Sequence, residues 1–326
     1  MKKKHTPAFA VLLAISLGIF ISCEKDIAFK GEVTDPMLVV NSTVNTDSVV
    51  SAHISQSRFV LGKVSPIPDV ENAAVTLYVN GTVMEKLAHK GKGVYKGSYV
   101  PKPSDEIGIE VEAPGFEKLG AKTMMPENVN LSVKSVTETV KENSYPGGNT
   151  GEKLIELNIK LTLTDNPEQE NYYFIKGRRN AYYQGMLQFS YPLDLKLSDI
   201  LDNKQVVGGG DAVSGILWEE DDGNRNIKNI FTDLFVNGKE LGLNFIFHEP
   251  VQTDPDQTIE YEIEVAQMSK DLYLYVISAN KAISNNGIPI VEATQVHSNM
   301  TNHVGILGAY NSHKMVFTCS RDDSNP

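Results

Sequence analysis

Apolar and polar residues alternate in short runs along most of the chain beyond residue 36. In the clearest run, Ile107, Ile109 and Val111 are each followed by a glycine or a glutamate. A period of two places one set of side chains in a core and the other in water, as in a half-buried strand. Runs of this kind, rich in Val, Ile, Tyr and Thr, predict strands at residues 37–44, 73–79, 93–100 and 107–113.

The dipeptide Asn80-Gly81 is the strongest turn signal in this part of the chain. Both residues tolerate the positive φ of a type I′ turn, so the dipeptide predicts a β-hairpin. The strands around it span roughly the ~100 residues of an immunoglobulin domain. We therefore expect an N-terminal immunoglobulin-like β-sandwich over residues 37–126.

The pattern stays β-rich but becomes less regular after residue 126. The apolar residues between Ser269 and Ile283 recur at helical spacing, which predicts a helix. Ser269, directly before them, is a residue type that favours the N-cap. Asn237-Gly238 predicts a second hairpin turn. Candidate strands occupy residues 129–140, 154–163, 172–176, 230–236, 241–247 and 259–265. The predicted class is mainly β, with a larger antiparallel β-sandwich or partial barrel at residues 127–320, one helix near the C-terminus, and a disordered tail at 321–326.

The N-terminal residues have the pattern of a secretion signal. Lysines at positions 2–4 precede an apolar run that is too short to span a bilayer, which needs ~20 residues. Ser22 is a small residue directly before Cys23, as in the lipobox of bacterial lipoproteins. We expect residues 1–22 to be removed, Cys23 to carry the lipid, and residues 23–36 to form a tether; the alternative is an ordinary signal with a chance cysteine. Cys319 is then left without a partner for an intramolecular disulfide.

Charge narrows the range of partners. The whole chain carries a formal charge of −11, and removing the three lysines of the signal makes it −14. Such a surface repels phosphate backbones, so nucleic acid is not an expected partner. The expected membrane contact is the N-terminal lipid, because acyl chains supply the anchoring energy.

Linear motifs of catalysis are missing from the sequence. It contains no G-x-S-x-G, H-E-x-x-H, P-loop or G-x-G-x-x-G pattern. Ser278 and Lys281 match S-x-x-K without the companion K-T-G triplet, and polar residues on an exposed helix face are the simpler interpretation. The acidic segments 219–224 and 253–256 lack the alternate spacing of a calcium loop. We therefore expect no enzymatic activity, no metal and no cofactor.

Clustered aromatic residues are the remaining functional signal. Tyr172, Tyr173, Tyr182 and Tyr183 lie close together, and two further aromatic residues follow within ten positions. Aromatic rings stack on sugars and anchor protein partners. Aromatic residues in strands are also common in cores, so the four tyrosines are candidates for either a binding surface or a core.

The order of motifs resembles the lipoprotein family known as domain of unknown function 4249, common in Bacteroidota. The shared segments cover most of the chain after the lipid cysteine, although residues 301–305 depart from the family's Asn-Gly-Gly turn. They lie at residues 35–41, 70–78, 93–95, 164–167, 171–174, 231–239, 271–275, 297–300 and 305–310. The family has no established catalytic residues to carry over.

This resemblance implies an outer-membrane lipoprotein, on the periplasmic or the cell-surface face, that acts beside a TonB-dependent receptor in nutrient capture. Combined with the residues, it predicts a non-enzymatic, lipid-anchored accessory or binding protein. Two alternatives remain open. One is an envelope hydrolase whose site is assembled from distant residues, and the other is a structural or adhesive surface protein.

Overall fold

A computed structural model describes residues 35–58, 66–142, 153–202, 229–251, 254, 256–285 and 294–319. The predictions for the signal peptide, for Cys23, for the acidic segment 219–224 and for the tail lie outside the described residues. The chain forms two units, one of Met1–Pro36 with Arg58–Ser65, and one of Met37–Ser57 with Pro66–Pro326. All the named strands and helices belong to the second unit. With 57% of the described residues in strands and 9% in helices, the predicted mainly-β class is confirmed.

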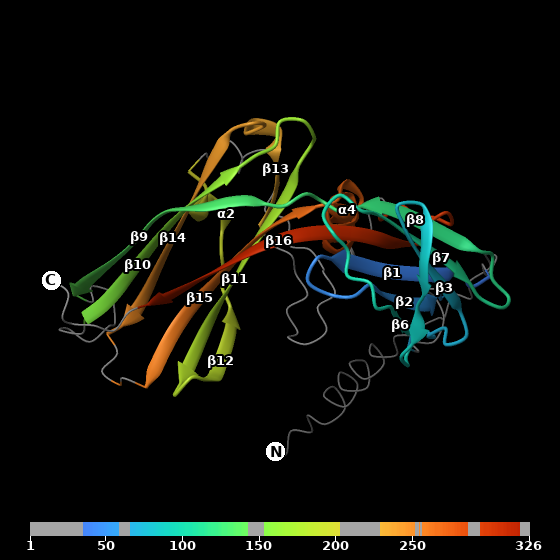
Figure 1. Ribbon diagram of the computed structural model, residues 1–326, viewed down its shortest axis with the longest axis horizontal. Helices are drawn as coiled ribbons and strands as arrows, with labels where there is room; N and C mark the ends of the chain where they lie inside the picture. Colours follow the sequence, from blue (N-terminus) through green and yellow to red (C-terminus); the bar gives the residue numbers. More distant parts are fainter. Residues whose placement is uncertain are drawn as a thin grey trace, which may run out of the picture. The chain divides into compact units, whose positions relative to one another are not determined.

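The largest element is a nine-stranded sheet that includes both the first and the last named strands (Figure 1). Its order is β12-β11-β15-β16-β1-β2-β6-β5, with β13 also paired to β11. Strand β16 runs parallel to β1 and antiparallel to β15. The bounds are β1 Leu38–Asn45, β2 Ser51–Gln56, β5 Ala88–His89, β6 Val94–Lys96, β11 Tyr172–Tyr183, β12 Met186–Pro192, β13 Ile230–Thr232, β15 Gln257–Met268 and β16 Gly305–Cys319.

Two smaller sheets pack against it. One has the order β4-β3-β7-β8 and the other β14-β10-β9. Their bounds are β3 Ala74–Val79, β4 Thr82–Lys86, β7 Glu106–Glu112, β8 Leu119–Met124, β9 Asn130–Glu142, β10 Lys153–Thr164 and β14 Glu240–Pro250. The helical elements are α2 Leu197–Ile200, the 3-10 helix η1 Asp233–Phe235 and α4 Lys270–Asn285. No helix among the described residues is long and apolar enough to cross a membrane.

The first core combines residues from the N-terminal half of the chain with residues from its end. The alternating Ile107, Ile109 and Val111 are buried, as predicted. Leu307 and Ala309 of β16 join them in the same core. Between β3 and β4, Asn80-Gly81 makes the predicted hairpin turn, with φ of 52° and 77°. The domain bounds 37–126 and 127–320 stay predictions.

The second core lies between β14-β10-β9 and the strands β11, β15 and β16. Apolar residues alternate along β10 and β15, so Leu157, Ile159 and Ile263 point inward. The free thiol of Cys319, expected to have no disulfide partner, is also buried here. The two smaller sheets thus each cover a different stretch of the nine-stranded sheet.

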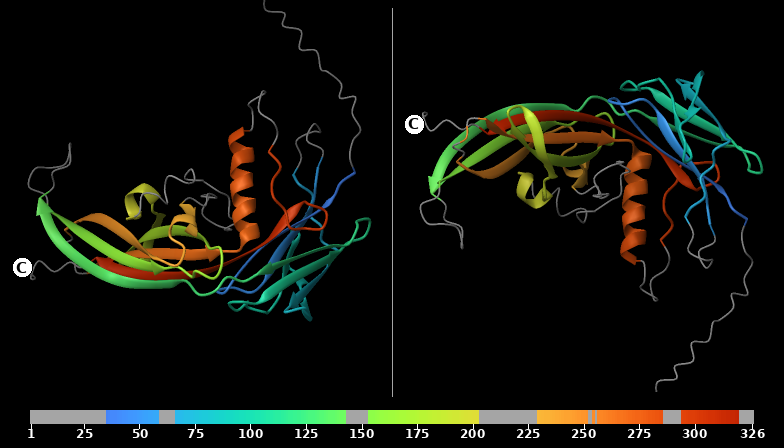
Figure 2. Two further views of the ribbon diagram at one scale, coloured as in Figure 1. Left: turned by 90° about the horizontal axis from the view of Figure 1, so that it is seen from above. Right: turned by 90° about the horizontal axis from the view of Figure 1, so that it is seen from below.

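Helix α4 packs across the opposite face of β15 and β16 from this core (Figure 2). The Oγ of Ser269 accepts the backbone N–H of Leu272 at 3.4 Å, which confirms the predicted N-cap. Leu272 and Val276 pack on Phe174. Gly308 permits this close approach, because a Cβ there would lie 2.9 Å from the Cβ of Leu272.

Two local predictions are wrong. The strand expected at residues 230–236 stops at Thr232, and η1 begins at Asp233. Asn237-Gly238 is a turn, but the elements around it do not pair with each other: β13 pairs with β11, and β14 pairs with β10. Asp233 explains both differences. Its buried carboxylate accepts the backbone N–H of Asn171, and the backbone leaves the strand at this residue.

Candidate functional site

The four candidate tyrosines take different positions. Tyr172 and Tyr173 are buried on opposite faces of β11. The ring of Tyr172 lies 4.4 Å from that of Tyr273, and the ring of Tyr173 stacks on Phe231 at 5.4 Å. Their positions are those of core residues. Tyr182 is half-buried, and Tyr183 is exposed at the end of the strand.

A buried polar cluster surrounds Tyr173. Its hydroxyl donates to Asp165 Oδ1 at 2.7 Å, and Asp165 Oδ2 accepts the backbone N–H of Gly238 at 2.8 Å. Asp233 Oδ2 accepts both the backbone and the side-chain N–H of Asn171, at 2.8 and 3.2 Å. Burial raises the pKa of Asp233, and the nearby charge of Asp165 raises it further. The hydrogen bonds of both carboxylates hold two turns together. We therefore interpret the cluster as structural.

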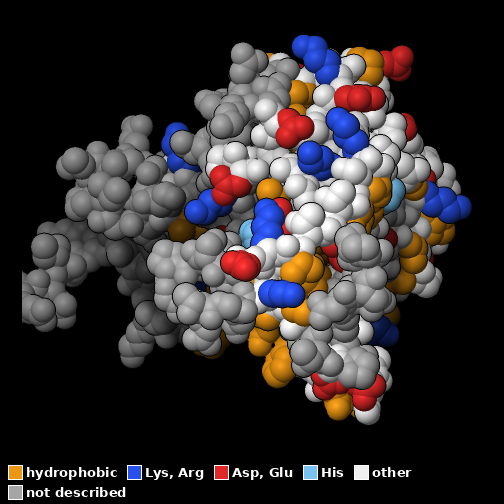
Figure 3. Space-filling model, turned by 90° about the vertical axis from the view of Figure 1, so that its left-hand side faces the viewer, with side chains coloured by type: hydrophobic (Ala, Val, Ile, Leu, Met, Phe, Trp, Pro, Cys, Tyr) orange, Lys and Arg blue, Asp and Glu red, His pale blue; other side chains and the backbone are white. Residues whose placement is uncertain are grey.

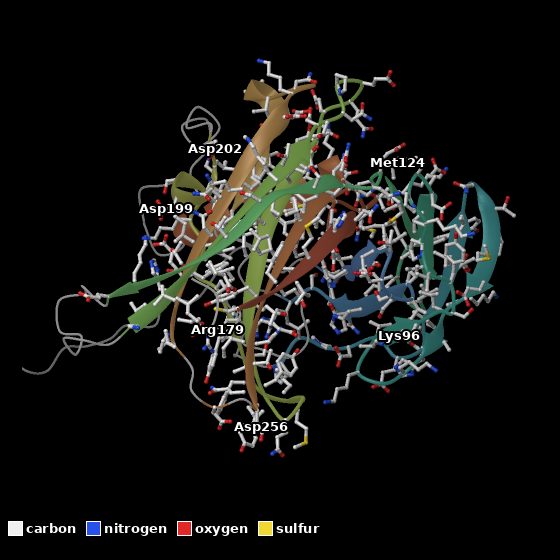
Figure 4. The ribbon with its side chains drawn as sticks, turned by 60° about the vertical axis from the view of Figure 1, so that its left-hand side comes forward. Lys96, Met124, Arg179, Asp199, Asp202 and Asp256 are labelled. Atoms are coloured by element: carbon white, nitrogen blue, oxygen red, sulfur yellow. The ribbon has the colours of Figure 1, made fainter. Side chains whose placement is uncertain are left out.

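A second buried cluster, built around Arg179 (labelled in Figure 4), joins the two sheets of the second core. Arg179 on β11 binds Glu249 on β14 through two hydrogen bonds, of 2.5 and 2.8 Å. The hydroxyl of Tyr261 donates to the same carboxylate. The hydrogen bonds to Glu249 raise the pKa of Arg179. The thiol of Cys319 nearby has a pKa raised by burial to about 12, so it stays protonated and is a poor nucleophile at neutral pH.

The Ser278 of the S-x-x-K match is held by the helix backbone. Its hydroxyl donates to the Leu274 carbonyl at 2.7 Å and accepts the backbone N–H of His297 at 2.8 Å. The imidazole of His297 lies 2.8 Å from Asp271 instead of facing the serine. Ser278, His297 and Asp271 therefore fasten residues 294–300 to α4 and do not form a Ser-His-Asp relay. No group of three metal-ligating side chains occurs among the residues that the structure describes.

Exposed apolar side chains gather where β11 turns into β12. We call this group the hairpin patch and define it by residues that are 41 to 63% exposed: Tyr183, Met186, Leu187, Phe189 and Tyr191. The register places Met186, Phe189 and Tyr191 on the same face as Tyr183, and Leu187, opposite Tyr182, on the other face. The Phe189 and Tyr191 rings are nearly parallel, at 13° and 6.0 Å. β12 is the edge strand of the nine-stranded sheet.

Polar contacts hold this hairpin in place. The turn residues Gln184 and Gly185 have φ of 49° and 76°, as a tight hairpin turn requires. The Gln184 side chain donates to Asp256 at 2.8 Å, and Arg178 donates to Ser190 at 3.0 Å. The backbone of the hairpin is therefore held in place before binding. Binding a partner there would lose little conformational entropy of the hairpin.

Exposed apolar residues also occur elsewhere, among charged ones, on the side of the molecule shown in Figure 3. Single exposed apolar side chains are ordinary, whereas neighbouring ones mark interaction surfaces. Four neighbouring residues on one face of the hairpin meet that description, with Leu187 on the other face. Sequence reasoning singled out Tyr183 but missed Met186 and Leu187, because their exposure follows from β12 being an edge.

Comparison with known proteins identifies a family for this chain. A family model described as "Domain of unknown function (DUF4249)" matches residues 24–315. No curated protein matches the chain. A solved structure described as "Complete structure of manganese lipoxygenase of Gaeumannomyces graminis and partial structure of zonadhesin of Komagataella pastoris" is 8% identical over 89% of this chain and 96% of that chain. Its TM-score of 0.13 is too low to carry an argument about fold or function.

Proposed function

The chain belongs to the family described as domain of unknown function DUF4249, and from that premise we propose that it is a lipid-anchored outer-membrane lipoprotein that binds a TonB-dependent receptor through its hairpin patch. In this proposal the protein is a non-enzymatic accessory of nutrient capture. The observation that carries it is the set of five neighbouring exposed apolar residues on a fixed edge hairpin.

The chemistry of the patch suits a protein partner. Phe189 and Tyr191 combine large apolar area with few rotatable bonds, and such side chains dominate the binding energy of protein interfaces. Met186 is flexible enough to adapt to an irregular surface. The polar rim at Gln184 and Asp256 supplies hydrogen-bonding groups around the apolar centre.

The proposed anchor rests on the residues around Cys23. The family match begins at residue 24, directly after this cysteine. Growth with labelled palmitate should label the protein, and Cys23→Ser should abolish the label. A labelled Cys23→Ser variant would refute the anchor.

The partner is tested by recovering the tagged full chain from gently solubilised membranes of the cells that produce it. The variant Phe189→Ser with Tyr191→Ser removes the rings of the patch. A matched control, Val83→Ser with Met84→Ser, changes two residues of the β3–β4 hairpin that are 57% and 47% exposed.

One hot-spot ring contributes about 2 kcal/mol, so receptor recovery should fall by at least about 30-fold in the patch variant. The control should recover as much receptor as the wild type. Equal recovery by both variants would refute the patch. Turnover of a glycan or peptide by the purified protein, abolished by a point substitution, would favour the hydrolase alternative.

A further inference from the structure

Residues 86–96, which run from the end of β4 through β5 to the end of β6, form a basic segment. The segment contains no aspartate or glutamate, and it holds four lysines, at positions 86, 90, 92 and 96. All four are exposed, and none of them forms an ion pair with the residues that the structure describes. Lys96 is labelled in Figure 4. The segment is therefore a positive surface on a chain of charge −11.

The turn of this segment lies at the end of the nine-stranded sheet where β1 begins. β1 pairs Leu38 with Gln56, the last residue of β2. Two positions earlier on β2, the backbone N–H of Ile54 donates to the Gly93 carbonyl at 2.8 Å. β6 runs antiparallel to β2, so the turn at residues 90–93 extends toward Gln56 and the start of β1.

Exposed apolar side chains lie at this same end of the sheet. Met37 and Ile67 are 45 and 56% exposed. They flank the end of β2, because the Met37 carbonyl accepts the backbone N–H of Ser57 at 2.7 Å, and the Pro68 carbonyl accepts that of Gln56 at 2.9 Å. We call these apolar and basic residues together the sheet-end surface and define it by Met37, Ile67, Lys90 and Lys92.

The chain also enters the second unit at this end. The first unit joins the second at residues 36–37, 57–58 and 65–66, and these junctions adjoin Met37, Ser57 and Ile67. Cys23, the lipid-carrying residue of the proposed function, lies 14 positions before Met37. Fully extended, these positions span at most about 50 Å. The lipid would therefore keep this end of the second unit close to the membrane.

We propose that the sheet-end surface lies against the membrane that holds the lipid of Cys23 and contacts its phosphate-bearing headgroups; the inference rests on the lipid anchor of the proposed function. Lysines are attracted to anionic headgroups, and exposed apolar side chains enter the interface beneath them. The neighbouring carboxylate of Asp69 is already bound to His53 at 3.0 Å. The short connection to the lipid raises the local concentration of the surface, so few lysines are needed.

Charge selects the membrane contact on this acidic protein. An anionic surface repels a chain of charge −11 except where basic residues outnumber acidic ones, as they do at residues 86–96. Lysines also protect the edges of sheets from pairing with other strands. That role does not account for Lys90 and Lys92, because β5 ends at His89 and β6 begins at Val94, so both lysines lie in the turn.

Fluorescence quenching on vesicles tests the contact with the lipidated full chain. Ile67→Cys supplies the labelling site, because the Cys319 thiol is buried and Cys23 carries the lipid. A fluorophore at position 67 should be quenched by headgroup-labelled lipid in vesicles that contain phosphatidylglycerol, and much less in vesicles of phosphatidylcholine alone. The matched control position is Ile246→Cys on β14, where the side chain is 47% exposed and quenching should be weak in both vesicles.

The basic turn is tested by Lys90→Ser with Lys92→Ser. One lysine near an anionic surface contributes about fivefold to the bound population, so this variant should lower the equilibrium constant for surface contact at least about tenfold. The matched control is Lys153→Ser with Lys160→Ser, which removes two exposed lysines of β10 and should leave the quenching unchanged. Equal quenching in the two double variants, or in the two kinds of vesicle, overturns the proposal.

Two further results separate this contact from the proposed function. Loss of the palmitate label would refute the anchor, whereas a palmitate-labelled protein with no quenching at position 67 refutes the sheet-end surface alone. If the lysines instead bind an acidic protein partner, neither vesicle will quench position 67, and Lys90→Ser with Lys92→Ser will lower receptor recovery. The hairpin variant Phe189→Ser with Tyr191→Ser should be quenched like the wild type, because the hairpin patch takes no part in this contact.

Discussion

Removing the guanidinium that spans the second core should destabilise the protein far more than removing a comparable surface cation. Arg179→Met deletes both hydrogen bonds to Glu249 and leaves that carboxylate with the hydrogen bond from the Tyr261 hydroxyl. The Glu249 side chain is 5% exposed, so water does not replace the lost charge. Breaking a buried pair in this way costs 3–5 kcal/mol.

The Arg179 side chain is 28% exposed, so solvent screening places the expected loss at the lower end of that range, about 3 kcal/mol. This corresponds to roughly a 150-fold change in the unfolding equilibrium constant. The matched control is Lys122→Met, which breaks a 2.7 Å pair with Glu106 whose side chains are 65% and 36% exposed. Its cost should stay below about 1 kcal/mol.

Urea unfolding, followed by tyrosine fluorescence and circular dichroism, measures both losses as changes in the free energy of unfolding. A third variant, Arg179→Met with Glu249→Leu, replaces the pair by apolar side chains and should recover most of the stability. The reasoning is refuted if Arg179→Met costs no more than Lys122→Met, or if the double variant is less stable than Arg179→Met alone.

Three further predictions concern single groups. Because burial raises the pKa of Cys319 to about 12, alkylation of this thiol at pH 8 should be about a thousandfold slower in the folded protein than in urea. Mass spectrometry of the Cys319 peptide measures both rates, and equal rates would contradict the burial of the thiol. Because the pKa of Asp233 is raised, the folded state loses stability as the pH rises above the ordinary range of an aspartate. Asp233→Asn should therefore gain stability relative to the wild type as the pH rises from about 4 to neutral, and a gap independent of pH would count against it. Gly308→Ala should cost about 1–3 kcal/mol, because the new methyl group meets Leu272, whereas Gly120→Ala, with its nearest neighbour at 3.5 Å, should be nearly neutral in the same thermal melts.

Local patterns in the sequence predicted local structure well. The alternation at Ile107, Ile109 and Val111 gave a strand with the expected buried face, and the cap at Ser269 marked the start of α4. Both signals arise between residues a few positions apart. The strand expected to reach residue 236 failed because Asp233 satisfies a partner 62 positions away, which no local pattern records.

The candidate surfaces depended on which strands lie at edges. Tyr172 and Tyr182 are the same residue type in the same strand. Tyr172 is buried against α4, whereas Tyr182 is half-buried beside an edge hairpin. Val133, Val136 and Val140 of β9 pair with buried residues of β10, and their exposure follows from sheet order. The Arg179–Glu249 pair, 70 positions apart, was invisible for the same reason.

The position of β16 has a consequence for how the chain acquires its structure. Its first half lies beside β1, with partners 265 positions apart, and its second half closes the other core. Contacts of such long sequence separation form late and slow folding. Neither core can be completed before residues 305–319 are available, so the earlier strands must be kept from aggregating until then. A nonsense mutation near residue 300 would disable both cores at once.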